Sequence, residues 1–192
     1  MRRSTLLVIA TCVLTFFIAL AATAQMAHDK SKRPSPPGAA TFAFADGKTI
    51  TIDYSRPKIN DPQSGKPRVI YGGLVPYGEV WRAGANEATS FVTQANLLIG
   101  GTPVPAGSYT LFILPQQSGP WKLIVSKKTG EWGIPYPGEQ YDLARFNMKA
   151  DKLAAPMQQL TISFEQRGAK AGLLKLEWEN TSASVEFSEA NH

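Results

Sequence analysis

The stretch TFAFADGKTITIDY, residues 41–54, alternates large apolar residues with small or polar ones around an Asp-Gly pair, and it predicts a β-hairpin. The length of the loop decides the register. A two-residue loop would put Phe42 and Phe44 on the face opposite the two isoleucines of the second strand. A loop of three residues that ends at Gly47 puts all four side chains on one face. We therefore predict a type I turn with Gly47 left-handed as a bulge, which pairs Phe42 with Ile50.

Similar short apolar runs follow along the chain, separated by glycine and proline turns. They predict strands at residues 91–99, 102–104, 108–114, 121–126, 142–149, 160–164, 173–179 and 184–187. The continuous apolar run at 108–114 is typical of a central strand, and residues 150–156 are expected to form a turn or a short helix. The pattern favours an all-β fold, a single-domain antiparallel β-sandwich that is jelly-roll-like or immunoglobulin-like.

The N-terminal segment has the features of a signal peptide. Two arginines precede an apolar run at residues 6–20, and Ala22-Thr23-Ala24 offers small residues for cleavage before Gln25. The alternative is an uncleaved membrane anchor, because the apolar run is nearly long enough to span a bilayer. We expect residues 1–24 to be a signal peptide, residues 25–40 a disordered linker and residues 41–190 the β-sandwich domain. The protein is then exported, periplasmic or extracellular, and the mature chain has no membrane span.

Several chemistries are excluded by the residues that the expected mature domain lacks. The only cysteine, Cys12, lies in the apolar run, and the two histidines, His28 and His192, lie in the linker and at the last position. Disulfides, cysteine nucleophiles, Ser-His-Asp triads and histidine-ligated metal sites are therefore not expected. The sequence has no phosphate-binding or dinucleotide-binding motif either. We expect neither a metal site nor a cofactor.

The net charge of +5 comes mainly from the N-terminal segment. Five of the twenty basic residues and one of the fifteen acidic residues precede residue 41. The remaining chain has fifteen basic and fourteen acidic residues, which gives +1. Because nucleic-acid binding needs concentrated positive charge, it is not expected.

The stretch YGGLVPYGEVWRAGANEAT, residues 71–89, is too rich in glycine for a helix and alternates too little for a strand. Its polar and aromatic residues predict a cleft that binds a small polar or anionic ligand or a saccharide, because arginine forks suit anions and aromatic walls suit sugars. The candidate ligand-binding residues are Arg56, Tyr71, Trp81, Arg82, Asn86 and Glu87. A second, weaker rim consists of Trp132, Tyr136 and Arg145. The alternative for the first group is a structural corner in which an arginine pairs with Glu87. The alternative for the second rim is a surface loop that one tryptophan holds in place.

Catalysis by this domain would need paired carboxylates, roughly 5–9 Å apart in a glycosidase. The candidates are Asp53, Glu79, Glu87 and Asp142, and their spacing selects no pair. We therefore favour a non-catalytic ligand-binding or envelope-associated module. The two alternatives are a metal-independent, glycosidase-like hydrolase that uses Glu87, and a purely structural or interaction protein. The sequence does not indicate the oligomeric state.

Three runs, YSRP (54–57), IYGGLVPYGEVWRAGANEAT (70–89) and PAGSYTL (105–111), resemble a bacterial secreted family known as domain of unknown function 2911. The pair Trp132-Gly133 and the run DLAR (142–145) are similar to this family as well. The resemblance covers residues 41–187 and implies an exported, mostly β protein without an established activity. The chain departs from the family pattern at Gln158-Gln159, where the resemblance implies an acidic residue.

Overall fold

The computed structural model describes residues 30–190 of the chain. The chain divides into two units, Met1–Arg33 and Pro34–His192. The described part of the first unit contains the short 3-10 helix η1 (Lys30–Lys32). The second unit contains β1 (Pro37–Ala43), β2 (Thr49–Ser55), β3 (Thr89–Thr93), β4 (Leu97–Ile99), β5 (Thr102–Val104), β6 (Gly107–Leu114), β7 (Trp121–Ser126), the 3-10 helix η2 (Glu139–Tyr141), β8 (Asp142–Gly168) and β9 (Ala171–Glu189). The expected signal peptide lies outside the described residues.

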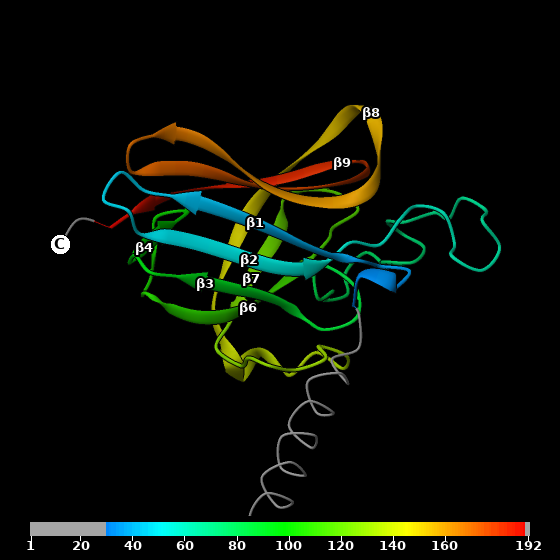
Figure 1. The fold of residues 1–192 in the computed structure, drawn as a ribbon, viewed down its shortest axis with the longest axis horizontal. Coiled ribbons are helices and arrows are strands. Elements are labelled where there is room, and N and C mark those ends of the chain that lie inside the picture. The colour runs from blue at the N-terminus through cyan, green and yellow to red at the C-terminus, as the bar shows by residue number, and fades with distance from the viewer. Residues whose placement is uncertain (1–29, 191–192) are drawn as a thin grey trace, which may run out of the picture. The chain divides into compact units, whose positions relative to one another are not determined.

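The nine strands form an antiparallel sheet in the order β1-β2-β3-β6-β7-β8-β9-β4-β5 (Figure 1). The sheet folds over along β8, because residues 142–148 of this strand pair with β7 whereas residues 149–168 pair with β9. The two layers face each other across an apolar core, in which the rings of Phe42 on β1 and Phe187 on β9 lie 4.9 Å apart. The predicted all-β, antiparallel, sandwich-like fold is confirmed.

The hairpin of β1 and β2 has the predicted register. Phe42 pairs with Ile50, and the N–H of Phe44 donates to the carbonyl of Lys48 at 2.9 Å, which closes a three-residue loop. Gly47 has a φ of 86°, a left-handed conformation that favours glycine. The strand β1 begins at Pro37, so residues 37–40, assigned to the linker from composition, belong to the sheet.

The predicted strand at 91–99 is wrong in its length, because the structure has two strands there. The strand β3 ends at Thr93, and β4 begins at Leu97 in the other layer, paired with β9. Between them the hydroxyl of Thr93 donates to the carbonyl of Ala95 at 2.7 Å and accepts from its N–H at 3.2 Å. These two bonds turn the backbone locally, which lets one apolar run serve both layers.

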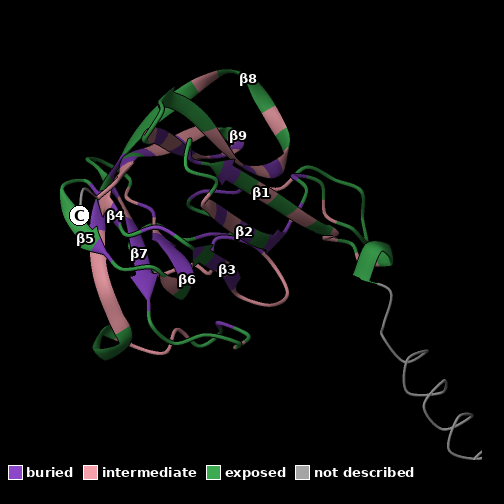
Figure 2. Ribbon diagram, turned by 60° about the vertical axis from the view of Figure 1, so that its left-hand side comes forward, coloured by how far each residue is buried: buried purple, intermediate pink, exposed green. Residues whose placement is uncertain are grey.

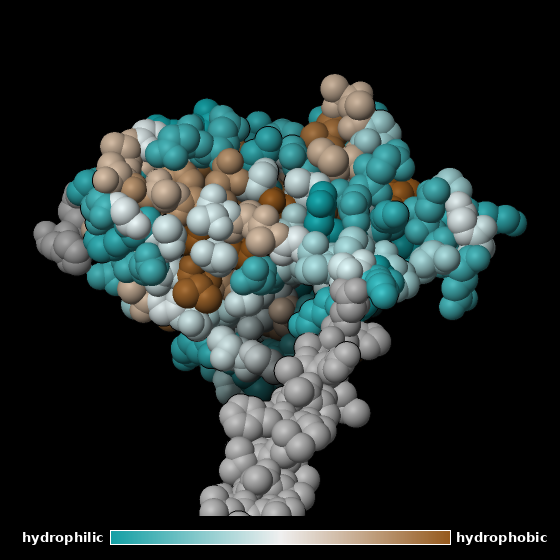
Figure 3. Space-filling model, viewed as in Figure 1, coloured by the Kyte–Doolittle hydropathy of each residue, from teal (hydrophilic) through white to brown (hydrophobic). Residues whose placement is uncertain are grey.

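The prediction of a turn or helix at 150–156 is also wrong, because β8 continues through this region as a strand. Its pairing with β9 shifts register at two points between Lys152 and Thr161. Here the backbone of β8 is paired instead with residues 57–59, through Ile59 N–H to Gln158 O and Leu160 N–H to Pro57 O, both at 2.9 Å. Ala154 to Pro156 of β8 are exposed. In Figure 3 the surface over this part of β8 includes tan and brown residues.

Many of the buried residues lie on the strands, and β6 and β7 are largely purple in Figure 2. One end of the core is filled by the phenylalanines Phe42, Phe44, Phe164 and Phe187, and the other by Tyr71, Trp81, Trp121 and Trp178. The predicted central strand β6 is buried on both faces. The loop between β7 and β8 covers its second face, where the rings of Phe112 and Tyr136 lie 5.1 Å apart.

Candidate functional site

The glycine-rich stretch forms two tight turns that end on β6. The N–H groups of Leu74 and Val75 donate to the carbonyls of Val69 and Ile70 at 3.0 and 2.9 Å, and Gly72 is left-handed with a φ of 85°. The chain then joins the end of β6 through Trp81, which exchanges two hydrogen bonds of 2.7 Å with Ile113. The turns send Tyr71 inward into the core and leave Tyr77 at the surface.

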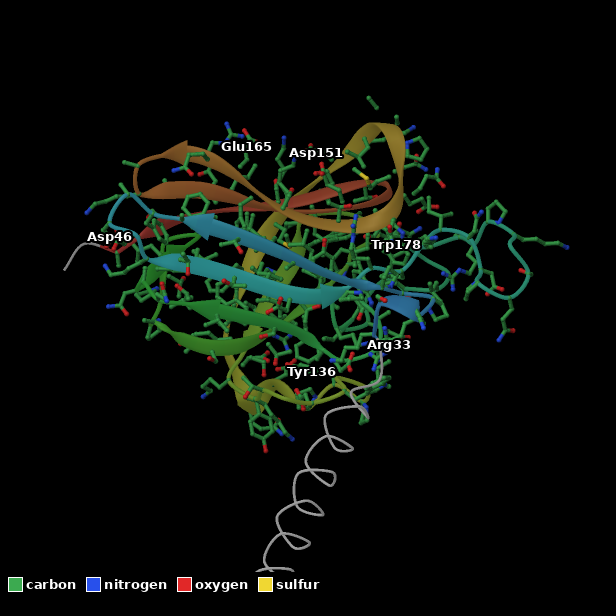
Figure 4. All side chains as sticks on the ribbon, viewed as in Figure 1. Arg33, Asp46, Tyr136, Asp151, Glu165 and Trp178 are labelled. Carbon is green, nitrogen blue, oxygen red and sulfur yellow. The ribbon has the colours of Figure 1, made fainter. Side chains whose placement is uncertain are left out.

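Four aromatic side chains meet here: Tyr71 and Trp81 come from this stretch, Trp121 from β7 and Trp178 from β9. The ring of Tyr71 lies 4.7 Å from Trp121 and 6.2 Å from Trp178, each edge to face, and Trp178 stacks on Trp81 at 5.8 Å. Trp178 is labelled in Figure 4. The indole N–H groups of Trp81 and Trp121 donate to the carbonyls of Gly84 and Gln116, both at 2.9 Å. The hydroxyl of Tyr71 and the indole N–H of Trp178 are buried without any hydrogen-bond partner.

A pocket of about 450 Å³ opens over this aromatic cluster. Its walls are Tyr71, Tyr77 and Trp121, the loop Gln116–Gly119, residues 150–152 of β8 and residues 179–181 of β9. Burial raises the pKa of Tyr71, and the nearby carboxylate of Glu179 and the phenol of Tyr77 raise it further. Tyr71 and both of these neighbours line the pocket.

The backbone of Glu179 is strained where it borders the pocket. Its φ of 52° is left-handed, a conformation that costs a residue other than glycine roughly 1–2 kcal/mol. Glu179 lies opposite the register shift of β8, where it pairs with Met157. Strained backbone of this kind is frequent at ligand sites. The neighbouring carboxylate of Asp151, labelled in Figure 4, forms an exposed ion pair with Lys149 at 3.0 Å.

Arg56 lies away from this pocket and joins β2 to β8. Its Nε donates to the carbonyl of Leu160 and its Nη2 to the hydroxyl of Thr161, both at 3.1 Å. In return, the side-chain amide of Gln159 donates to the Arg56 carbonyl at 2.9 Å. A carboxylate at position 159 could not donate this bond, which gives the glutamine a structural role at the site where the family pattern implied an acid.

We expect Arg56→Met to lower the free energy of unfolding by about 2 kcal/mol, because it leaves polar groups of β8 without a charged donor. In a domain of this size the melting temperature should fall by about 4–8 °C. Thermal unfolding followed by circular dichroism measures the change. Arg167→Met is the matched control, since the ion pair of Arg167 with Glu165 is exposed on both sides and should contribute little. Equal shifts for the two variants would contradict the role of Arg56.

The loop at 83–89 is attached to the end of β2 by Asn86. This residue has a φ of 58°, and its Nδ2 donates to the carbonyl of Ser35 at 3.0 Å and to the hydroxyl of Ser55 at 3.1 Å. Burial lowers the pKa of the Arg82 guanidinium, and the nearby Glu87 carboxylate acts in the opposite direction. The Arg82 guanidinium also lies 5.4 Å from the centre of the Trp132 ring.

The structure therefore does not bring all residues of the predicted cleft to one pocket. Tyr71 lines the pocket and Trp81 packs behind it, whereas Arg56, Arg82, Asn86 and Glu87 do not line it.

The predicted second rim is divided as well. Trp132 is 53% exposed beside Arg82, while Tyr136 and Arg145 share the carboxylate of Asp142. The hydroxyl of Tyr136 donates to Asp142, and Arg145 Nε donates to the same carboxylate at 2.7 Å. Burial, together with the hydrogen bond from Tyr136 to Asp142, raises the pKa of Tyr136 to about 12. The network, near the Tyr136 label in Figure 4, fastens the loop between β7 and β8 to the sheet.

Sequence reasoning missed most of the residues that line the pocket. They come from the loop after β6, the middle of β8 and the second half of β9. The available signal was weak: the polar residues Glu179 to Thr181 interrupt the alternation of an otherwise regular strand, and Gln116-Gln117 come soon after the apolar run at 111–114.

Within residues 30–190 no group of three or more His, Cys, Asp or Glu side chains is placed to hold a metal ion. No helix in that part of the chain has the length and apolar character needed to cross a membrane.

Fold and site together define a small antiparallel β-sandwich protein with an open polar pocket at the aromatic end of its core. The sequence model of the family described as "Protein of unknown function (DUF2911)" matches residues 35–187, and the chain belongs to this family. This confirms the resemblance seen in the sequence. The comparisons with curated proteins and with solved structures gave no match.

Proposed function

We propose that this protein is a non-catalytic binding module that holds a small polar ligand in the pocket beside Tyr71. The observation that carries the proposal is the hydroxyl of Tyr71, a residue that lines the pocket: this hydroxyl is buried without a hydrogen-bond partner. An unsatisfied buried hydroxyl costs about 1–3 kcal/mol. A phenylalanine would make the same ring contacts with Trp121 and Trp178 at no such cost, so the hydroxyl has a use other than packing.

The polar character of the pocket supports binding. Amide side chains of Gln116, Gln117 and Asn180 and the charged groups of Asp151 and Glu179 surround the opening. The hydroxyl oxygen of Tyr71 has less than 1 Å² of accessible surface, so a ligand accepts its hydrogen bond only if the side chains around it move. A few convergent polar groups over an aromatic floor are typical of small-molecule sites.

Binding is favoured over hydrolysis by the positions of the carboxylates. Glu87, on which the glycosidase hypothesis depended, lies near Arg82 and does not line the pocket. Asp151 in the pocket is exposed and paired with Lys149 at 3.0 Å, whereas a general acid is usually kept in an apolar setting.

The cell exterior or periplasm is the proposed location, and an association with the envelope is part of the same proposal. It rests on the signal-like sequence of residues 1–24, which lie outside the described residues.

We expect Tyr71→Phe to leave the melting temperature of the chain from Gln25 onward unchanged, or to raise it by up to about 4 °C. The variant removes a buried hydroxyl that has no partner, and this removal is neutral or stabilising. The same variant should weaken ligand binding. Differential scanning calorimetry of both proteins measures the first effect. A fall of more than about 2 °C would mean that the hydroxyl serves stability.

The binding itself is tested by ligand-observed NMR with small polar compounds at millimolar concentration: neutral sugars, amino sugars, carboxylates and inorganic phosphate. At least one class should bind the wild type and bind Tyr71→Phe more weakly. If no class binds the wild type, the proposal is wrong.

A further inference from the structure

We infer that the ligand of this pocket is a neutral saccharide, whose sugar ring stacks on Tyr77 while its hydroxyls bond the carboxylates and amides of the wall. This inference rests on the proposed function and narrows its ligand to one chemical class. Three features of the pocket carry it: the sign of its charge, its single exposed aromatic ring and the planar polar groups around that ring.

The charge of the pocket disfavours an anion. Two carboxylates, Asp151 and Glu179, and one cation, Lys152, line it, and Asp151 is also ion-paired with Lys149 at 3.0 Å. The field of Glu179 also acts on the Tyr71 hydroxyl and opposes a second negative charge there. The arginines that suggested an anionic ligand, Arg56 and Arg82, lie outside this pocket. A phosphate or carboxylate would therefore meet the carboxylate of Glu179 with no arginine fork to bind it.

The aromatic surface of the pocket fits one face of a sugar ring. Tyr77 is 39% exposed, whereas Tyr71 and Trp121, the other aromatic residues of the wall, are buried. The edge of the Tyr77 ring rests against Gly72, where a Cβ would come within 3.0 Å of its Cε2 atom. One supported, exposed ring offers a stacking platform. A quaternary ammonium is normally bound by several aromatic faces at once, and this pocket lacks that arrangement.

The carboxylates and amides of the pocket wall are suited to bind the hydroxyls of a sugar. Carboxylates accept two hydrogen bonds side by side, and an amide both donates and accepts, so each can bind a pair of neighbouring sugar hydroxyls. Asp151, Glu179 and Asn180 provide such groups from two adjacent strands, and Gln117 provides one from the loop. The bond from the Trp121 indole to the Gln116 carbonyl at 2.9 Å holds that loop in place. The volume of about 450 Å³ lies within the range of small-molecule sites.

The experiment uses saturation-transfer NMR on the chain from Gln25 onward, with glucose, N-acetylglucosamine and their β-1,4-linked dimers as probes. Inorganic phosphate, citrate and choline serve as charged competitors. We expect saturation of at least one sugar ring and no displacement by the competitors. We expect Tyr77→Ala to weaken that binding about tenfold, since it removes the stacking platform. Tyr141→Ala is the matched control, because Tyr141 is 37% exposed and does not line the pocket.

The variant Glu179→Gln distinguishes the ligand classes. For a neutral sugar it should weaken binding by less than about tenfold, because an amide still bonds hydroxyls. Binding of phosphate or citrate that is strengthened by Glu179→Gln, or binding of choline that it abolishes, would overturn the saccharide while leaving the proposed binding function intact. Sugar binding that survives Tyr77→Ala unchanged would also overturn the inference. If none of the probes and no other polar compound binds, the proposed function fails with it. Melting curves of each variant establish that it is folded.

Discussion

Gly73→Ala is expected to lower the free energy of unfolding by about 3 kcal/mol, the upper part of the usual range for overpacking. A Cβ at this position would lie 2.5 Å from the carbonyl oxygen of Val69 and 3.1 Å from its Cβ. The carbonyl is backbone, and it accepts the hydrogen bond from Leu74 that closes the turn. It therefore has little freedom to move away. Chemical denaturation should show the loss, and the melting temperature should fall by about 6–12 °C.

Gly78→Ala is the matched control for this prediction, because it changes a glycine of the same stretch where a Cβ would meet nothing within 4 Å. Its φ of 78° is left-handed, so the substitution adds backbone strain alone, about 1 kcal/mol. If Gly73→Ala is no more destabilising than Gly78→Ala, the first turn can rearrange and the steric explanation is wrong. A large difference would show that the second glycine of the Gly72-Gly73 pair is required for the turn that places Tyr71 and Tyr77.

Trp178→Ala is expected to have the second large effect, about 4 kcal/mol, because it opens a cavity at the centre of the aromatic cluster. Trp178 is fully buried, stacks on Trp81 and contacts the edge of Tyr71. The melting temperature should fall by about 8–16 °C. Trp178→Phe should cost clearly less, since it keeps an aromatic ring and removes an indole N–H that has no partner.

Trp132→Ala provides the comparison for Trp178, since it deletes a tryptophan that is 53% exposed. Its ring lies 5.4 Å from the Arg82 guanidinium, a cation–π contact worth about 0.5–1 kcal/mol at an exposed site. Thermal unfolding of the three variants should therefore rank Trp178→Ala as the most destabilised and Trp132→Ala as the least. The reverse order would mean that the loop between β7 and β8, and not the aromatic cluster, holds this end of the sandwich together.

The hairpin at residues 41–54 could be predicted down to its register because its information is local. The spacing of Phe42, Gly47 and Ile50 leaves one loop length that buries both strands on the same face, and the structure has that loop. The same reasoning predicted β6 as a central strand, because only a strand covered on both sides tolerates a continuous apolar run. Local alternation and turn residues were sufficient for these two elements but not for β9, which is one strand where two, at 173–179 and 184–187, were predicted.

The predictions failed where the partner of a segment lies far away along the chain. Residues 150–156 lack the pattern of a strand, yet β8 continues through them, with residues 150–152 paired with residues 181–183 of β9. The run 91–99 reads as one strand, yet a hydroxyl bond at Thr93 divides it between two layers. In both regions the strand pairs with β9, which lies far along the chain, and a local sequence pattern does not record that pairing.

The candidate site shows the same division. The sequence by itself determined that this is a β protein, that the stretch from Tyr71 to Thr89 is irregular, and that histidine and cysteine chemistry is absent from the domain. Only the tertiary structure decided that Arg56 and Asn86 hold strands and loops together, while Tyr71 and Tyr77 join residues of β8 and β9 around one pocket. The reason is physical: a turn or an alternating strand depends on neighbours within a few residues, whereas a pocket exists only after distant strands have paired and packed.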